Sequence, residues 1–92
     1  MSDQVNANPE EIRIFAQTLE IFNGQLSELV SGLNARLFGL GESWRDREFE
    51  QFKDVFEQTV HGLNRFLPES ERYVRFLHQK AEHLERFLEH KL

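Results

Sequence analysis

The segment Gly39-Leu40-Gly41-Glu42-Ser43-Trp44-Arg45-Asp46 lies between two long amphipathic patterns and decides the fold. Two glycines so close together favour the end of a helix. A serine followed three residues later by an acidic residue is typical of the capping box that begins a helix. We therefore predict a tight turn over residues 39–43, with the second helix beginning near Ser43 or Asp46.

The sequence before this turn has the signals of one long helix. Asn8 suits the N-cap, Pro9 suits the first helical position, and two glutamates follow at the positive end of the helix dipole. Apolar residues then recur in alternating steps of three and four, which predicts a seam for a partner helix. This predicted seam consists of Ile12, Phe15, Leu19, Phe22, Leu26, Leu29 and Leu33. The helix should span about residues 9–38, after a flexible arm over residues 1–8.

The sequence after the turn predicts a second helix over about residues 45–90, with a kink or break at Pro68. A break makes residues 69–90 a third helix and the fold a three-helix bundle. The absence of Gly, Asn and Asp between Phe66 and Tyr73 favours the kink, because a tight reversal lacks its usual residues. A C-terminal seam continues beyond the proline at Val74, Leu77, Ala81, Leu84 and Leu88.

Helix lengths raise the question of what covers the C-terminal seam. Pairing back from the turn brings the start of the first helix level with about residue 74, so residues 74–92 should overhang. Such an apolar surface is not left in water, so it must bend back at Pro68 or meet another chain. The predicted fold is therefore an all-α antiparallel hairpin, one domain over residues 9–92.

The first helix is poor in charge on its outer side. Between Ile14 and Ala35 the only charged residues are Glu20 and Glu28. Small uncharged residues suit the close approach of another helix, and depletion of charge is typical of an interface core. The alternative is chance composition in a short window. The predicted dimer interface consists of Ile14, Ile21, Gly24, Ser27, Ser31 and Ala35.

Composition excludes several classes of protein. The chain has 92 residues, no Cys and a net charge of −5, which argues against thiolate chemistry and against nucleic-acid binding. No apolar run is long enough for membrane insertion, and no N-terminal apolar region indicates a signal peptide. The protein should be cytoplasmic, or exported without a classical signal peptide.

The sequence predicts no enzyme, cofactor or metal site. Glu82, His83, Glu89 and His90 come nearest to a metal cluster, but no HExxH or paired Glu-x-x-His motif is present. Solvated helix positions explain these residues better. There is no Gly-rich phosphate loop, and Ser43 has no histidine nearby in sequence to activate it.

The single tryptophan, Trp44, is the residue that points most specifically to one kind of protein. It either closes the end of the hairpin core, with its indole N–H reaching a turn carbonyl, or forms a recognition element at the tip. The predicted turn motif consists of Trp44, Arg45, Asp46, Phe49 and Phe52.

These features resemble the Trp-x-Gly (WXG) family of small helical hairpins associated with type VII secretion. Trp44 matches the family tryptophan, Phe52 lies where the family often has an aromatic residue, and Asp46 stands where the family has Gly. An aspartate is tolerable there because it adopts turn conformations and caps helices. The resemblance covers nearly the whole chain. It implies hairpins that pair as homo- or heterodimeric four-helix bundles, and that are exported folded or escort larger toxins.

The resemblance also implies partners and an export signal. The partner is the chain itself or a paralogous hairpin, with a secretion ATPase or a larger toxin as further partners. The family signal is a Tyr followed four residues later by Asp or Glu, whereas Leu77 follows Tyr73 here. We therefore predict a non-enzymatic dimerising protein that serves a type VII-like system as substrate or escort. The alternative is a coiled-coil adaptor unrelated to secretion.

Overall fold

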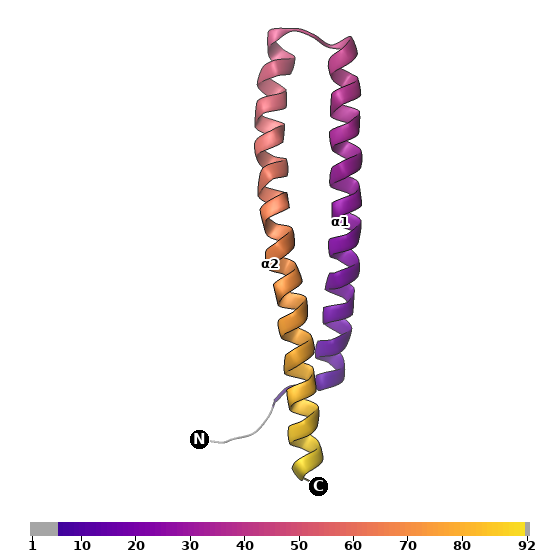
Figure 1. The fold of residues 1–92 in the computed structure, drawn as a ribbon, viewed down its shortest axis with the longest axis vertical. Helices are drawn as coiled ribbons and strands as arrows, with labels where there is room; N and C mark the ends of the chain where they lie inside the picture. Colours follow the sequence, from indigo (N-terminus) through magenta and orange to yellow (C-terminus); the bar gives the residue numbers. More distant parts are fainter. Residues whose placement is uncertain (1–5, 92) are drawn as a thin grey trace.

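The computed structural model describes residues 6–91, which form two long antiparallel helices joined at one end (Figure 1). Helix α1 spans Pro9–Ser43 and helix α2 spans Arg47–Lys91. The molecule measures 69 × 25 × 14 Å and its radius of gyration is 20.7 Å. A compact domain of this length would have a radius of gyration of roughly 12 Å. The predicted all-α hairpin is confirmed, in an elongated form.

Helix α1 begins as its sequence predicts. The side-chain oxygen of Asn8 accepts hydrogen bonds from the backbone N–H groups of Glu10 and Glu11, at 2.9 and 3.4 Å. Pro9 occupies the first helical position, where its missing N–H costs nothing. These contacts satisfy two of the N–H groups that a helix start leaves without an intrahelical partner.

The predicted end of α1 is wrong. The helix continues through Gly39 and Gly41 to Ser43, and no glycine in the described residues has a positive φ. The N–H of Trp44 still bonds to the carbonyl of Leu40, at 2.9 Å. A helical glycine costs only about 1 kcal/mol relative to alanine, so contacts of this last turn with α2 outweigh the local preference. The connection is therefore the short segment 44–46.

Helix α2 is capped by Asp46, the second of the two predicted starts. The carboxylate of Asp46 accepts a hydrogen bond from the backbone N–H of Phe49, at 3.0 Å. The capping box predicted at Ser43 is wrong, because this residue still belongs to α1 and its hydroxyl donates to the carbonyl of Leu40 at 3.3 Å.

Helix α2 passes through Pro68 without a break, so the three-helix alternative is wrong. Figure 1 shows α2 leaning towards α1 beyond its midpoint. A proline inside a helix removes one backbone hydrogen bond. Continuous packing on both sides of Pro68 keeps α2 in one piece, since Val60 and Val74 are both buried.

The seam of α1 differs from the predicted one by one residue in every heptad. Its buried residues recur every seven positions, at Ala16, Asn23, Val30 and Leu37. The residues directly before three of them, Phe15, Phe22 and Leu29, are 59%, 48% and 66% exposed, so their assignment to the seam is wrong. Both seams share the half-buried Leu19 and Leu26. In two of these three heptads both alternative positions are apolar, Phe15 with Ala16 and Leu29 with Val30, so periodicity alone does not distinguish the two seams.

The predicted overhang of residues 74–92 is too long. Ser70 contacts Asn23, and Arg13 near the start of α1 pairs with Glu85, so α1 covers α2 well beyond residue 74, and only the last turns of α2 extend past the start of α1 (Figure 1). The error follows from ending α1 at residue 38, since the extra turn at the tip displaces the pairing along α2. Most of the C-terminal seam is covered within the chain: Val74, Ala81 and Leu84 are buried and Leu77 is half-buried, while Leu88 is exposed.

Candidate interaction surfaces

An aromatic cluster closes the tip of the hairpin. The ring of the half-buried Trp44 lies 5.3 Å from that of the buried Phe49 and is stacked 6.2 Å from that of Phe52. Phe56 extends the cluster, with its ring 5.7 Å from Phe52. Trp44 therefore packs on the first two turns of α2 and covers the end of the seam.

Asp46 ties this cluster to the helix cap. Its hydrogen bond from the Phe49 backbone N–H lowers the pKa of the carboxyl group, partial burial opposes this shift, and the nearby Trp44 indole N–H lowers the pKa further. Asp46 therefore caps α2 directly beside Trp44.

Two neighbouring residues complete the tip. A Cβ atom on Gly41 would lie 3.0 Å from Cζ of Phe49, so the glycine makes room for this ring. The Arg45 Nε–H donates to the carbonyl of Glu42 at 3.0 Å, which satisfies one of the last carbonyls of α1. The predicted turn motif thus forms one connected structure, in which Arg45 stays exposed.

One side of the hairpin carries most of the exposed rings. In an antiparallel helix pair, the positions directly before one set of seam residues lie on the same side of both helices. These positions on α1 and α2 form what we call the apolar flank, which consists of Phe15, Phe22, Leu29, Phe52, Phe66 and Tyr73. Each of these side chains is more than a third exposed. Sequence reasoning missed this surface because it assigned the α1 members to the seam.

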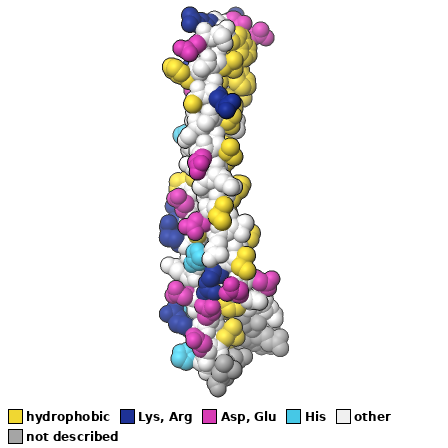
Figure 2. Space-filling model, turned by 90° about the vertical axis from the view of Figure 1, so that its right-hand side faces the viewer, with side chains coloured by type: hydrophobic (Ala, Val, Ile, Leu, Met, Phe, Trp, Pro, Cys, Tyr) yellow, Lys and Arg dark blue, Asp and Glu magenta, His cyan; other side chains and the backbone are white. Residues whose placement is uncertain are grey.

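The opposite side of the seam is polar and hollowed. Two grooves lie there between the helices, one near the tip with a volume of about 650 Å³ and one at the middle with a volume of about 600 Å³. We call this side the grooved flank. In Figure 2, hydrophobic side chains run down one edge of the hairpin, and most charged side chains gather along the other edge and at the ends.

A polar pair interrupts the seam at its middle. The hydroxyl of Ser70, which is fully buried, donates to Oδ1 of Asn23 at 2.8 Å. Asn23 is only 6% exposed, and within residues 6–91 its Nδ2 has no hydrogen-bond partner. Asn23 also lines the middle groove. A buried donor without an acceptor is costly, so a polar group that reaches the groove would be stabilised there.

An ion pair joins the helices at the far end of the grooved flank. Both guanidinium nitrogens of Arg13 donate to the carboxylate of Glu85, at 3.0 and 2.6 Å. These hydrogen bonds lower the pKa of Glu85 and raise that of Arg13. This pair fixes which residue of α2 lies beside the first turns of α1.

The residues predicted as the dimer interface are all exposed on α1 and lie outside the apolar flank. We call this set, Ile14, Ile21, Gly24, Ser27, Ser31 and Ala35, the small-residue surface. Gly24 and Ser27 also border the middle groove. A Cβ on Gly24 would meet nothing within 4 Å, so the hairpin itself does not require this glycine.

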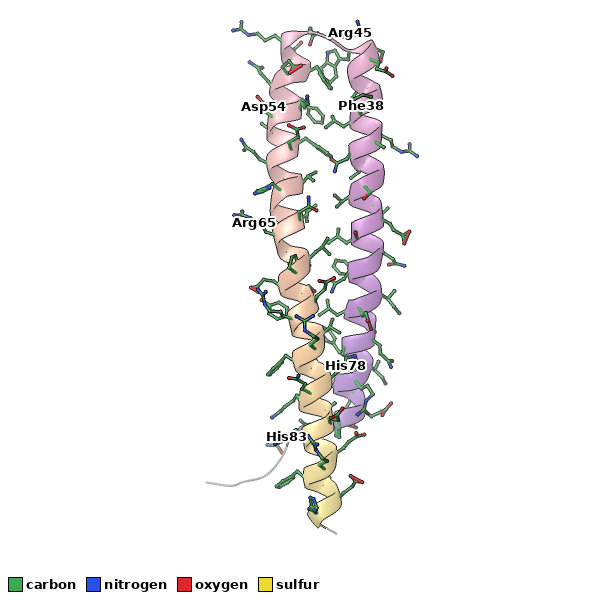
Figure 3. The ribbon with its side chains drawn as sticks, in the orientation of Figure 1. Phe38, Arg45, Asp54, Arg65, His78 and His83 are labelled. Atoms are coloured by element: carbon green, nitrogen blue, oxygen red, sulfur yellow. The ribbon has the colours of Figure 1, made fainter. Side chains whose placement is uncertain are left out.

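The described residues show no arrangement typical of a metal site. Figure 3 shows His78 and His83 at different heights along α2, and residues 6–91 contain no group of three or more His, Cys, Asp or Glu side chains able to hold a metal ion. Neither described helix combines the length and the hydropathy that a membrane span requires. The surfaces available are therefore the tip, the two flanks and the small-residue surface.

Comparison with known proteins identifies the family. No curated protein matches the chain significantly. One family's sequence model does, described as proteins of 100 residues with WXG, and it matches residues 4–87. The match includes both helices and the tip with Trp44. The chain therefore belongs to the WXG100 family of small helical proteins associated with type VII secretion.

Proposed function

We propose that this protein is a non-enzymatic interaction protein that pairs with a second helical hairpin, itself or a paralogue, and serves a type VII-like secretion system as substrate or escort. The observation that supports the pairing is the apolar flank. Exposed rings and aliphatic side chains extend over both helices there, and a soluble monomer rarely leaves so large an apolar patch in water. A second hairpin laid on this flank makes a four-helix bundle.

The thin core of the hairpin supports the same proposal. Its buried apolar residues form a single line between two helices, and two of them are alanines. A chain of this length buries little of its surface on folding. A partner that binds only the folded hairpin therefore stabilises the folded state, and a tighter partner stabilises it more.

The small-residue surface is a second candidate for the contact. Gly24 lies inside a helix, where glycine costs about 1 kcal/mol relative to alanine, and no contact within the hairpin requires it. The close approach of a partner helix would explain the choice. This surface and the apolar flank lie on different sides of α1, so single substitutions distinguish them.

Light scattering on two variants tests the pairing. Leu29→Arg places a charge on the apolar flank and should weaken pairing at least ~30-fold, as expected for a contact at an interface centre. Ser31→Arg places the same charge on the small-residue surface and is the matched control. Loss of pairing only in Ser31→Arg would transfer the interface to the small-residue surface, and a wild-type monomer at micromolar concentration would contradict the proposal.

The role in secretion depends on how the pair is exported. Tyr73 is exposed, but the residue four positions on, Leu77, is half-buried against α1, where the carboxylate of the family signal would be desolvated. We propose that the partner supplies the signal. Export of the chain from cells with a type VII system should then require co-expression of that partner and an intact secretion ATPase. Unchanged localisation without the ATPase would favour the adaptor unrelated to secretion.

A further inference from the structure

The two grooves of the grooved flank have features that the hairpin does not need for its own folding. The floor of the tip groove is apolar, with Leu37, Phe49 and Val60. At its edge stands Phe38, labelled in Figure 3, whose side chain is 78% exposed. An aromatic ring so exposed beside an apolar floor is suited to cover an apolar side chain from another molecule.

Carboxylates border both grooves. Glu42, Glu50 and Glu57 line the tip groove, and Glu20 and Glu71 line the middle groove. The permanently charged basic residues among the lining are only Lys53 and Arg75. Within the described part of the chain, none of the five carboxylates forms an ion pair. The grooved flank therefore presents a net negative charge around apolar floors.

The middle groove adds a directional feature. The buried amide of Asn23 has an unpaired N–H donor and lines this groove. Beside it, Gly24 leaves the wall open, and Leu67 and Val74 form the apolar part of the lining. The groove thus combines a hydrogen-bond donor, space for close approach and an apolar contact.

We propose that the grooved flank docks a basic amphipathic helix of another protein, separately from the hairpin that packs on the apolar flank. Apolar side chains of such a helix would fill the two groove floors, and its lysines or arginines would meet the carboxylates at the edges. A second copy of this chain fits poorly, because a symmetric contact through this flank would bring carboxylates against carboxylates. The proposal does not depend on pairing through the apolar flank.

A synthetic amphipathic helix of leucine and lysine is the probe for this proposal. Trp44 reports on binding by fluorescence, because its ring contacts Phe49 in the floor of the tip groove. The full-length chain should bind the probe saturably, and binding should weaken as salt is raised. Reversing the tip carboxylates with Glu50→Lys and Glu57→Lys should weaken binding by roughly tenfold or more.

Matched variants decide where the probe binds. Glu28→Lys with Glu82→Lys changes the net charge equally but leaves the grooves intact, so binding should be nearly unchanged. Phe38→Ala should weaken binding without changing the helix content, whereas Leu29→Ser on the apolar flank should not weaken it. Absence of saturable binding, equal loss in the two charge-reversed pairs, or loss only in Leu29→Ser would each overturn the proposal. Pairing is measured separately by light scattering, so its failure is distinguishable.

Discussion

The apolar flank and the grooved flank are built by the same two helices and border the same seam, yet their chemistry is opposite. On α1, the residues directly before the first three seam positions are Phe15, Phe22 and Leu29, whereas those four after are Glu20, Ser27 and Asn34. One flank therefore offers apolar area, and the other offers carboxylates, an amide and open space. The difference shows how a two-helix protein presents two distinct surfaces without a third element.

The single tryptophan stands where the two flanks meet. Its ring stacks on Phe52 of the apolar flank and contacts Phe49, which lines the tip groove. Asp46, which follows Trp44 by two residues, caps the start of α2. Trp44 therefore contacts residues of both flanks near the tip, in addition to closing the end of the seam.

The largest effect expected from this comparison is on pairing. Phe22→Ser with Tyr73→Ser removes one apolar side chain from each helix of the apolar flank. Fully burying two such side chains contributes about 3–6 kcal/mol, so the affinity of the pair should fall ~10²–10⁴-fold by sedimentation equilibrium. Ile14→Ser with Ile21→Ser is the matched control, because both side chains are similarly exposed on the small-residue surface. Equal losses in the two double variants would break the distinction between these surfaces.

The polar pair in the seam should show the next largest effect. Ser70→Ala leaves Oδ1 of Asn23 buried without its donor and should lower the free energy of unfolding by about 1–3 kcal/mol in urea denaturation. Asn23→Leu with Ser70→Ala removes both polar groups and should restore or exceed the wild-type stability. If the double variant were less stable than Ser70→Ala, the polar pair would be a net contributor and the groove donor would be already satisfied.

Two glycines near the end of α1 should respond differently to substitution by alanine. A Cβ on Gly39 meets nothing within 4 Å, so Gly39→Ala should stabilise the hairpin by about 0.5–1 kcal/mol through helix propensity. A Cβ on Gly41 meets the Phe49 ring at 3.0 and 3.1 Å, so Gly41→Ala should lose most of that gain or destabilise the protein. Equal stabilisation in both variants, measured by thermal denaturation, would show that the Phe49 ring adjusts freely.

The same residues show how far sequence reasoning reaches. Asn8, Pro9 and the long alternation of apolar residues predict the start of α1 and the hairpin, because capping and periodicity act locally. The end of α1 is mispredicted because a helical glycine costs little compared with tertiary packing against Phe49. The apolar flank is missed because Phe15 and Ala16 fit neighbouring seams equally well, and only the contact with α2 selects the alanine. The grooves depend on residues from both helices, so no single stretch of sequence indicates them.

The smallest effect expected is on acid stability. The hydrogen bond from Arg13 lowers the pKa of Glu85, and the backbone N–H of Phe49 lowers that of Asp46. A carboxyl group with a lowered pKa in the folded state stabilises that state above its unfolded pKa, and the stabilisation is lost as the pH falls through the folded-state value. The melting temperature should therefore begin to fall as the pH drops to about 4.5, the ordinary pKa of a glutamate carboxyl group.

Glu85→Gln and Asp46→Asn should each lower the melting temperature at pH 7 and make it less sensitive to acid. The two sites lie at opposite ends of the hairpin, so their effects should add. A wild-type curve that is flat between pH 5 and pH 2 would mean that neither bond holds the ends of the hairpin together in solution.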